Sequence, residues 1–206
     1  MKILNILSSI NGKNSHSNKL VSAINTRISS EFTDVEILVR DLSENPLPHL
    51  DASHFVAFGL PSEARTPEAE AAVFHSDTAI SEIRQADIIV IAVPFYNFNI
   101  PGTLKSWIDH IVRSGATFTY GENGPKGLLE NKKVYLAMAS GGIYSTEAMK
   151  GLDFAEPYLR FLLGFIGLTD VTTFRVEGTK MQGVGEKSYE KAIERISEHM
   201  FATQKL

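Results

Sequence analysis

Short apolar runs alternate with amphipathic stretches along most of the chain. Residues 86–93 become continuously apolar after a polar start and stop at Pro94, a pattern typical of a central parallel strand buried on both faces. Val35, Ile37 and Val39 alternate with polar residues as they would in a half-buried strand. Together with three further apolar runs, the pattern predicts strands over residues 2–7, 35–39, 86–93, 133–140 and 171–176.

The segments between these strands show helical spacing. Leu20, Ile24 and Ile28 lie one turn apart and predict a helix from about residue 18. Thr66-Pro67-Glu68 is typical of a helix start, with proline at the first helical position and an acid in the first turn. The remaining pattern predicts helices over 67–85, 103–113, 154–166 and 187–200, a long connection over 45–66 and an irregular insertion over 114–132.

Alternating strands and helices indicate βαβ units around a parallel sheet. Five strands fit a flavodoxin-like α/β fold, a three-layer sandwich with a doubly wound sheet in the order 2-1-3-4-5. Right-handed crossovers favour that order, although the sequence does not give it directly. The length of 206 residues and a hydrophobic share of 43% predict a single globular domain over residues 1–206.

Composition narrows the possible functions. A net charge of −4 provides no basic surface for nucleic acid or for a membrane. The absence of cysteine excludes disulfides, thiolate nucleophiles and Fe–S ligation, so redox chemistry would need a bound organic cofactor or a metal held by other ligands. No run approaches the roughly 20 apolar residues of a membrane span, and we expect a cytoplasmic location. The six histidines form no metal-binding motif, and we expect no metal site.

In doubly wound folds the ligand lies beyond the carboxyl ends of the strands, where the strand order reverses. The loop after the first strand is rich in hydroxyls, among them Ser9, Ser15 and Ser17. It lacks both G-x-G-x-x-G and the P-loop pattern, so a phosphate held by serine hydroxyls and a helix N-terminus is the pattern left standing. An ordinary polar loop with a serine cap is the alternative.

The loops after the third and fourth strands suit a flat ring. Phe95, Tyr96, Asn97 and Phe98 combine apolar flanks with amides, as heteroaromatic ligands require, although plain packing is the alternative. The second of these loops, Ala139-Ser140-Gly141-Gly142, allows close backbone approach to a ring, or else forms a tight turn. In the insertion, Phe118 and Tyr120 either cover a ring, pack on another subunit or anchor a surface loop.

These residues carry a resemblance to a known family. Over essentially its whole length the chain resembles the bacterial FMN-dependent NADH:quinone oxidoreductases and NADH-azoreductases. The resemblance rests on Ser9, Ser15–Asn18, Val39–Leu42, Pro94–Asn99, Leu104-Lys105, Gly115–Tyr120, Glu122–Pro125, Gly127-Leu128, Ser140–Gly142, Phe161-Leu162, Gly164–Gly167 and Asp170-Val171. The Tyr-Asn-Phe and Gly-Phe-Ile-Gly segments together are the most specific part.

The resemblance implies an FMN enzyme that reduces quinones and azo compounds with NADH or NADPH by ping-pong, two-electron hydride transfer. FMN phosphate is then bound by Ser9, Ser15, His16 and Ser17, and its ring lies against residues 95–98 and 139–142. The family forms homodimers with active sites at the interface, so Phe118, Tyr120 and Phe161 are expected to reach the partner's substrate site. No catalytic residue is expected beyond Tyr120 and Tyr144 as helpers in proton transfer.

One departure from the family stands out. Where the family has Ser-Arg-Gly-Gly, this chain has Ala139-Ser140-Gly141-Gly142, which removes a cation near the ring. Because this cation is missing, the sequence determines neither the redox potential nor the choice between NADH and NADPH.

Two other classes of protein remain as alternatives. One is a flavodoxin-type electron carrier without much reductase activity of its own, although such carriers tend to be more acidic than −4. The other is a flavin-free α/β module, such as a hydrolase or a regulatory domain.

Overall fold

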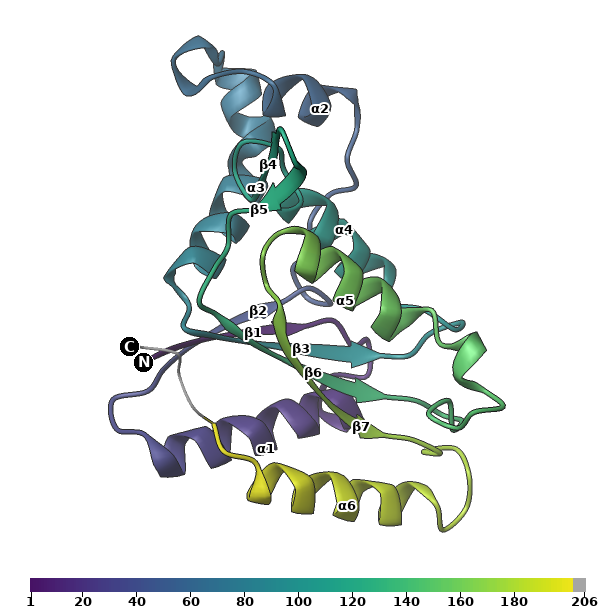
Figure 1. Cartoon of the computed structure of the whole chain (residues 1–206). Helices are drawn as coiled ribbons and strands as arrows, with labels where there is room; N and C mark the ends of the chain where they lie inside the picture. Colours follow the sequence, from purple (N-terminus) through teal and green to yellow (C-terminus); the bar gives the residue numbers. More distant parts are fainter. Residues whose placement is uncertain (202–206) are drawn as a thin grey trace.

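A computed structural model describes residues 1–201 of the chain, and residues 202–206 of the predicted domain lie outside it (Figure 1). Its centre is a parallel sheet in the order β2-β1-β3-β6-β7. Strands β4 and β5 form a separate hairpin, so β6 and β7 are the fourth and fifth strands of the sheet, and the order is the predicted 2-1-3-4-5. The strands are β1 (Lys2–Leu7), β2 (Glu36–Asp41), β3 (Ile88–Pro94), β6 (Lys133–Ala139) and β7 (Asp170–Val176).

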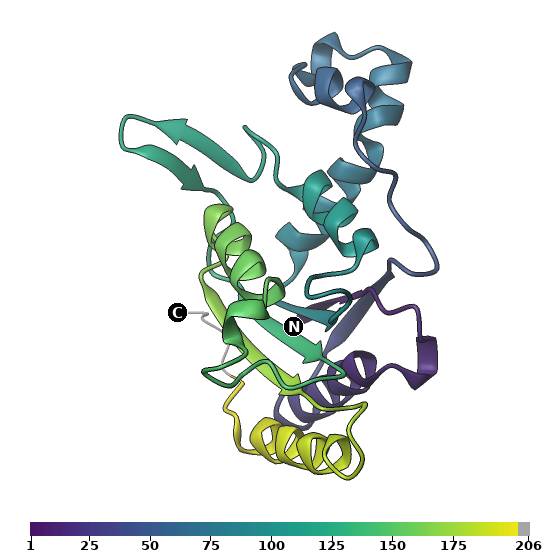
Figure 2. The ribbon, with the colours of Figure 1, turned by 90° about the vertical axis from the view of Figure 1, so that its right-hand side faces the viewer.

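Helices cover both faces of the sheet and complete the predicted flavodoxin-like sandwich (Figures 1 and 2). One face carries α1 (His16–Glu31) and α6 (Gly185–Glu198), and the other carries α3 (Pro67–Gln85), α4 (Gly102–Ile111) and α5 (Ala155–Phe165). Short 3₁₀ turns lie at Gly12–Asn14, Ser62–Ala64 and Lys150–Leu152.

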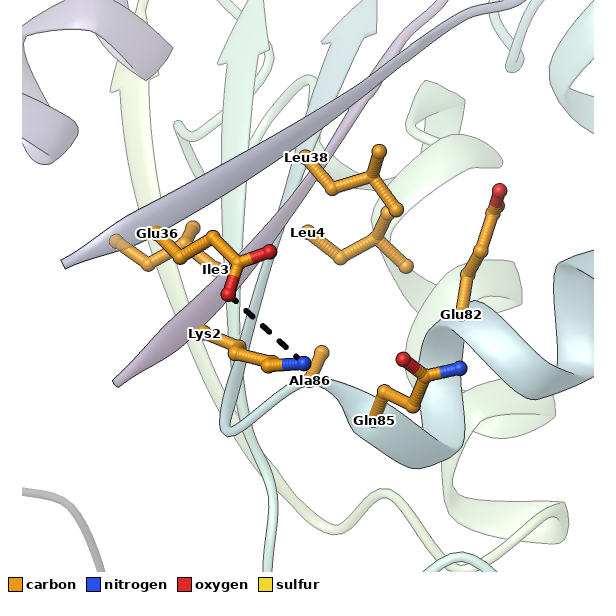
Figure 3. A pocket seen from close by; sticks show the side chains of 8 residues that line it. All are labelled: Lys2, Ile3, Leu4, Glu36, Leu38, Glu82, Gln85 and Ala86. Atoms are coloured by element: carbon orange, nitrogen blue, oxygen red, sulfur yellow. Dashed lines mark ion pairs between the residues drawn. The ribbon is translucent and has the colours of Figure 1, made fainter.

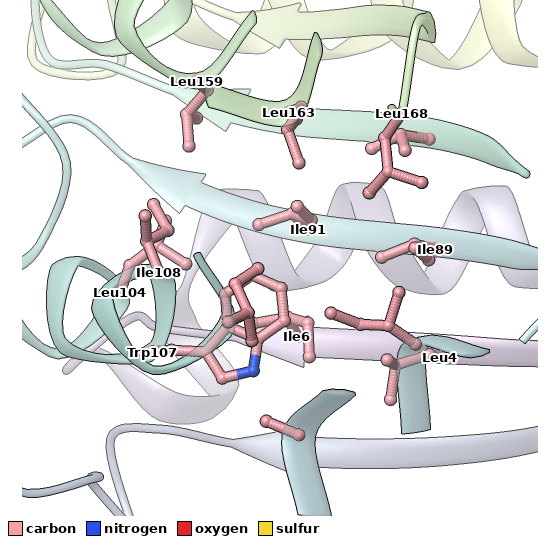
Figure 4. Close-up of a cluster of buried hydrophobic side chains, with 14 of the residues drawn as sticks. Leu4, Ile6, Ile89, Ile91, Leu104, Trp107, Ile108, Leu159, Leu163 and Leu168 are labelled. Carbon is pink, nitrogen blue, oxygen red and sulfur yellow. The ribbon is translucent and has the colours of Figure 1, made fainter. Parts of the chain in front are cut away.

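Strand β3 holds the two layers together because it is buried along its whole length. Successive side chains of a strand point to opposite faces. Ile89 and Ile91 therefore join the core beneath α3, α4 and α5, part of which Figure 4 shows. Ile88 and Val90 join the core formed with α1 and α6. Each such side chain contributes about 1.5–3 kcal/mol of hydrophobic stabilisation.

The predicted irregular insertion over 114–132 is wrong in its central part. The structure has an antiparallel hairpin there, β4 (Phe118–Gly121) paired with β5 (Gly124–Gly127), which projects from the body (Figure 2). Strand β5 reads Gly-Pro-Lys-Gly and contains none of the β-branched or aromatic residues that indicate strands. Its base is fixed by close backbone contact, since a Cβ on Gly127 would lie 2.1 Å from the nitrogen of Gly167.

The long connection predicted over 45–66 also contains a helix, α2 (Ala52–Phe58), which packs on α3. Asp51 caps it by accepting from the backbone N–H groups of Ser53 and His54. That capping signal is legible in the sequence. The first helix begins at His16 and not near residue 18, because Ser15 is its N-cap.

No helix within residues 1–201 is long and apolar enough to cross a membrane. The same residues contain no group of three His, Asp or Glu side chains placed to hold a metal ion. A small cavity of about 70 Å³ lies at the amino ends of β1 and β2, beside the ion pair of Lys2 with Glu36 (Figure 3). It is smaller than the roughly 300 Å³ of a ligand pocket and lies at the wrong end of the sheet for one.

His110 on α4 is fully buried and contributes a pH-dependent element to the fold. Its Nε2 lies 2.9 Å from the carbonyl oxygen of Pro48, whereas its Nδ1 has no partner among the described residues. The rings of His54 and His75 lie 5.3 and 6.3 Å away, centroid to centroid. Burial, and then the proximity of these two histidines, lowers the pKa of His110 below its ordinary value.

We therefore predict that acid destabilises the protein partly through His110. Because its pKa is lower in the folded state, the unfolded chain takes up the proton first as the pH falls below about 6.5. The free energy of unfolding should then decline by at most about 1.4 kcal/mol per pH unit for this group. In His110→Gln, urea unfolding measured across this range should show a shallower decline than in wild type. Equal slopes in the two proteins would contradict this assignment.

Candidate functional site

The loops singled out in the sequence meet at the carboxyl edge of the sheet. Strands β1, β3 and β6 are neighbours and run in parallel, so the loops that follow them leave the sheet side by side. Direct bonds tie these loops together: Ser8 Oγ donates to the Ala92 carbonyl at 2.7 Å, and the Phe95 N–H donates to the Ala139 carbonyl at 2.8 Å. The three segments therefore form one continuous surface.

The serine loop presents two buried hydroxyls at the start of α1. Ser15 Oγ accepts from the backbone N–H of Asn18 at 3.2 Å, and it lies 3.0 Å from Ser17 Oγ in a second hydrogen bond. Both side chains are at most 2% exposed. The first backbone N–H groups of a helix have no partner within the helix and favour an anion. The arrangement offers hydroxyl and backbone donors to a single phosphate.

Ser9 connects the serine loop with the aromatic loop. Its hydroxyl accepts from the backbone N–H of Asn11 at 3.3 Å and lies 3.4 Å from the hydroxyl of Tyr96. Ser9 is buried, while Tyr96 is half-buried at the end of β3. Two residues that the sequence assigned to different loops are thus direct neighbours.

His16 is exposed at the first turn of α1 and has lysines nearby. Partial burial is the largest cause that lowers its pKa, followed by the charges of Lys19 and Lys180. The neutral imidazole that results near pH 7 offers a hydrogen bond but no charge. Sequence reasoning missed Lys180, whose backbone N–H donates to the Gly141 carbonyl at 3.2 Å. No local sequence pattern links Lys180 to the site, because position 180 lies far along the chain, beyond the last strand.

The aromatic loop is a tight turn that presents its tip to solvent. Tyr96 and Asn99 exchange two backbone hydrogen bonds of 3.0 Å. Between them Asn97 and Phe98 have φ of 48° and 67°, a left-handed conformation that costs a bulky residue about 1–3 kcal/mol. The turn leaves both side chains exposed at the edge of the sheet. Strain of this kind concentrates where a side chain must be presented to a ligand.

The glycine loop lies directly against the aromatic one. Ser140 is buried, and its hydroxyl donates to the Gly142 carbonyl at 2.8 Å, so the residue found in place of arginine braces the turn. A Cβ on Gly142 would come 3.3 Å from the ring of Tyr144. That ring lies 4.5 Å from Phe95, centroid to centroid. A side chain at position 142 would therefore have to displace the Tyr144 ring slightly, so glycine lets the loop pack closely beside the aromatic turn.

The three expected substrate residues lie elsewhere in the chain. Phe118 on the hairpin is buried and packs on Phe165, with ring centroids 4.6 Å apart. Tyr120 on the hairpin and Phe161 on α5 are 71% and 69% exposed. Within residues 1–201, no ring contact joins these three to the aromatic loop or to Tyr144. In one chain they are separate from the surface that the loops form.

The donor set at the carboxyl edge fits a flavin mononucleotide. Buried hydroxyls and free backbone N–H groups suit its phosphate, and aromatic side chains with exposed amides suit a flat, apolar ring with polar edges. Backbone N–H groups of the glycine loop are accessible to a ring carbonyl because no Cβ shields them.

Comparison with known proteins agrees with this geometry. A family model described as a flavodoxin-like fold matches residues 1–200. An FMN-dependent NADH:quinone oxidoreductase of Mesorhizobium japonicum is 49% identical over 181 residues, 88% of this chain and 86% of that protein. The protein of the same description from Vibrio vulnificus is 44% identical over 201 residues, 98% of this chain and 97% of its own length.

The solved structures point the same way. The crystal structure of an azoreductase from Bacillus anthracis str. Sterne superposes with a TM-score of 0.85 at 26% identity, covering 97% of this chain and all of that one. This chain therefore belongs to the flavodoxin-like family of FMN-dependent NADH:quinone oxidoreductases.

Proposed function

We propose that this chain binds FMN and catalyses the reduction of quinones and azo compounds by NADH or NADPH. The observation that carries the proposal is the buried pair of hydroxyls on Ser15 and Ser17, set at a helix N-terminus beside an aromatic turn. Relatives that share 40–49% of the sequence are named for FMN, NADH and quinone, and a structural neighbour is an azoreductase.

Bound FMN supplies the two-electron redox chemistry, and the protein supplies position and electrostatics. Ser9, Ser15 and Ser17 hold the phosphate through their hydroxyls, and the His16 imidazole adds a further hydrogen-bonding group. Phe95 to Phe98 provide one side of the slot for the ring, and Ala139 to Gly142 provide the other. The direct bond between Phe95 and Ala139 keeps the two sides at a fixed separation.

Protons for the reduced product come from water, with Tyr144 and Tyr120 as helpers. Tyr144 is half-buried beside Phe95, so its hydroxyl is placed at the rim of the ring slot. Tyr120 is exposed on the hairpin and reaches a ring slot only across an interface.

We also propose a homodimer whose active sites lie at the interface. Exposed apolar side chains gather on the hairpin and on α5 with its preceding turn: Tyr120, Leu152, Phe154 and Phe161. Monomeric soluble proteins rarely leave large apolar patches uncovered. A partner that covers this patch would bring Tyr120 and Phe161 to the second ring slot. The domain proposed for this function spans residues 1–206, and the family match covers residues 1–200. The proposed location is the cytoplasm.

The first prediction concerns the phosphate site. The double change Ser15→Val with Ser17→Val removes two hydroxyl donors to a charged group, which should weaken FMN binding by at least about 100-fold. Riboflavin, which lacks the phosphate, should bind wild type and variant within about threefold of each other. Quenching of flavin fluorescence measures both affinities. The matched control is Ser22→Val on the exposed side of α1. Unchanged FMN affinity in the double variant would contradict the placement of the phosphate at Ser15 and Ser17.

The second prediction separates an enzyme from an electron carrier. In anaerobic titration, NADH or NADPH alone should bleach the yellow absorbance of the FMN-loaded protein in one two-electron phase. A quinone added afterwards should restore the colour. The net charge of −4 is mild for a carrier that docks on basic partners, which favours the enzyme. A long-lived one-electron spectrum, with no bleaching by either nicotinamide, would support the carrier instead.

The third prediction tests the dimer. Phe161→Asp places a charge in the proposed interface and should raise the dimer dissociation constant by at least about 100-fold, as loss of a large buried aromatic does. Light scattering after gel filtration measures the change. Leu38→Asp on the edge strand β2, also an exposed apolar residue, is the control and should stay dimeric. A wild-type protein that is monomeric at micromolar concentration contradicts the proposal.

A further inference from the structure

The segment just after the glycine loop, Tyr144-Ser145, is tied to the end of β7 by a carboxylate that the sequence analysis did not single out. Glu177 accepts from the backbone N–H groups of Tyr144 and Ser145 at 2.8 and 3.0 Å, both at Oε1. Its Oε2 accepts from the Ser145 hydroxyl at 2.5 Å. Bonds from two backbone donors and a hydroxyl to an ionised group are among the stronger ones in proteins. One side chain therefore fixes two consecutive residues, Tyr144 and Ser145, just after the glycine loop.

Glu177 is itself held in place. Its side chain is 12% exposed, and the Arg175 guanidinium lies 3.6 Å from Oε1. Arg175 is paired in turn with Asp153 and Glu156 at the start of α5. The backbone N–H of Glu177 donates to Ser188 Oγ on α6 at 2.8 Å. The carboxylate thus belongs to a rigid frame formed by β7, α5 and α6.

The segment that Glu177 fixes carries the Tyr144 ring into the aromatic cluster of the site. That ring lies 4.5 Å from Phe95 and 6.0 Å from Phe98, centroid to centroid. It also lies over Gly142, where a Cβ would approach it to 3.3 Å. The position of Tyr144 therefore sets the rim between the aromatic and glycine loops. A shift of the 144–145 backbone would widen or close that rim.

We propose that Glu177 is a positioning residue of the ring slot, holding the backbone of Tyr144 and Ser145 so that the Tyr144 ring stays packed on Phe95. This inference rests on the proposed binding of a flavin at the carboxyl edge. It assigns Glu177 no contact with the cofactor and no part in proton transfer. Glu177 acts through Tyr144, so its loss affects binding of the flavin ring and not of the FMN phosphate.

The test compares Glu177→Ala with Glu177→Gln. Alanine removes both carboxylate oxygens and with them all three hydrogen bonds, whereas glutamine keeps an oxygen for the two backbone N–H groups and loses the charge. Arg175 remains paired with Asp153 and Glu156 in both variants, so the frame should persist. In the flavin-free protein, the amides of Tyr144 and Ser145 should exchange hydrogen at least about tenfold faster in the alanine variant. Glutamine should hold the exchange within about threefold of wild type.

Flavin binding supplies the second readout. Glu177→Ala should weaken FMN and riboflavin by the same factor, about tenfold, because the ring is common to both ligands. Its visible circular dichroism should change with the environment of the ring. Glu177→Gln should restore the affinity and the spectrum to nearly wild-type values.

Asp51→Ala is the matched control. Asp51 accepts from the N–H groups of Ser53 and His54 at 2.9 and 3.2 Å and from the Ser53 hydroxyl at 2.6 Å, a similar set of donors at the start of α2. Its loss should lower the free energy of unfolding without changing exchange at Tyr144 or flavin affinity. An equal effect of both alanine variants on flavin affinity would assign Glu177 a role in stability alone and overturn the proposal.

Two further outcomes overturn it. Wild-type exchange and flavin affinity in Glu177→Ala would show that the bonds do not position Tyr144. A glutamine variant as impaired as alanine would show that charge, and not position, matters. Failure of the proposed function looks different, because wild type itself would then bind neither FMN nor riboflavin.

Discussion

The pairing of β3 between β1 and β6 is the constraint on which the rest of the molecule depends. All seven residues of β3 are buried, so each hydrophobic side chain must find a layer of helices on its own face of the sheet. A register slip of one residue would turn the side chains of each core to the opposite face of the sheet, away from the helices against which they pack. The register that satisfies both layers also fixes where the strands end. The candidate site is built at those ends, and its precision derives from the packing of the sheet.

Backbone and side-chain bonds continue across the edge where the ladder stops. Leu42 donates to Leu7, Ser8 to Ala92, Phe95 to Ala139 and Ser140 to Val176, so neighbouring loops are joined one to the next. Each bond satisfies a polar group that would otherwise be buried without a partner. The loops consequently have little freedom relative to one another. The proposed phosphate site after β1 and the proposed ring slot after β3 and β6 would therefore keep a fixed separation.

The strained and charged features lie along the same edge. Phe98 adopts a left-handed backbone conformation in the aromatic turn, and its carbonyl accepts from the Phe154 N–H at 3.1 Å. Arg175 gathers carboxylates from α5 and from the segment after β7. The left-handed conformation costs free energy locally and persists because the surrounding core determines the positions of β3 and α5. Both features lie beside the proposed ring slot.

The sequence by itself determined the five strands, the main helices and the three loops of the candidate site, because periodicity and helix caps are local properties of the chain. It also indicated a flavin, since hydroxyls before a helix and aromatics after a strand are local as well. Only the tertiary structure decided that Ser9 meets Tyr96, that Lys180 lies at Gly141 and that Glu177 holds Tyr144. Those contacts join positions at least 33 residues apart. The hairpin required tertiary structure too, because β5 follows from its docking on Gly167 and not from strand-forming residues of its own.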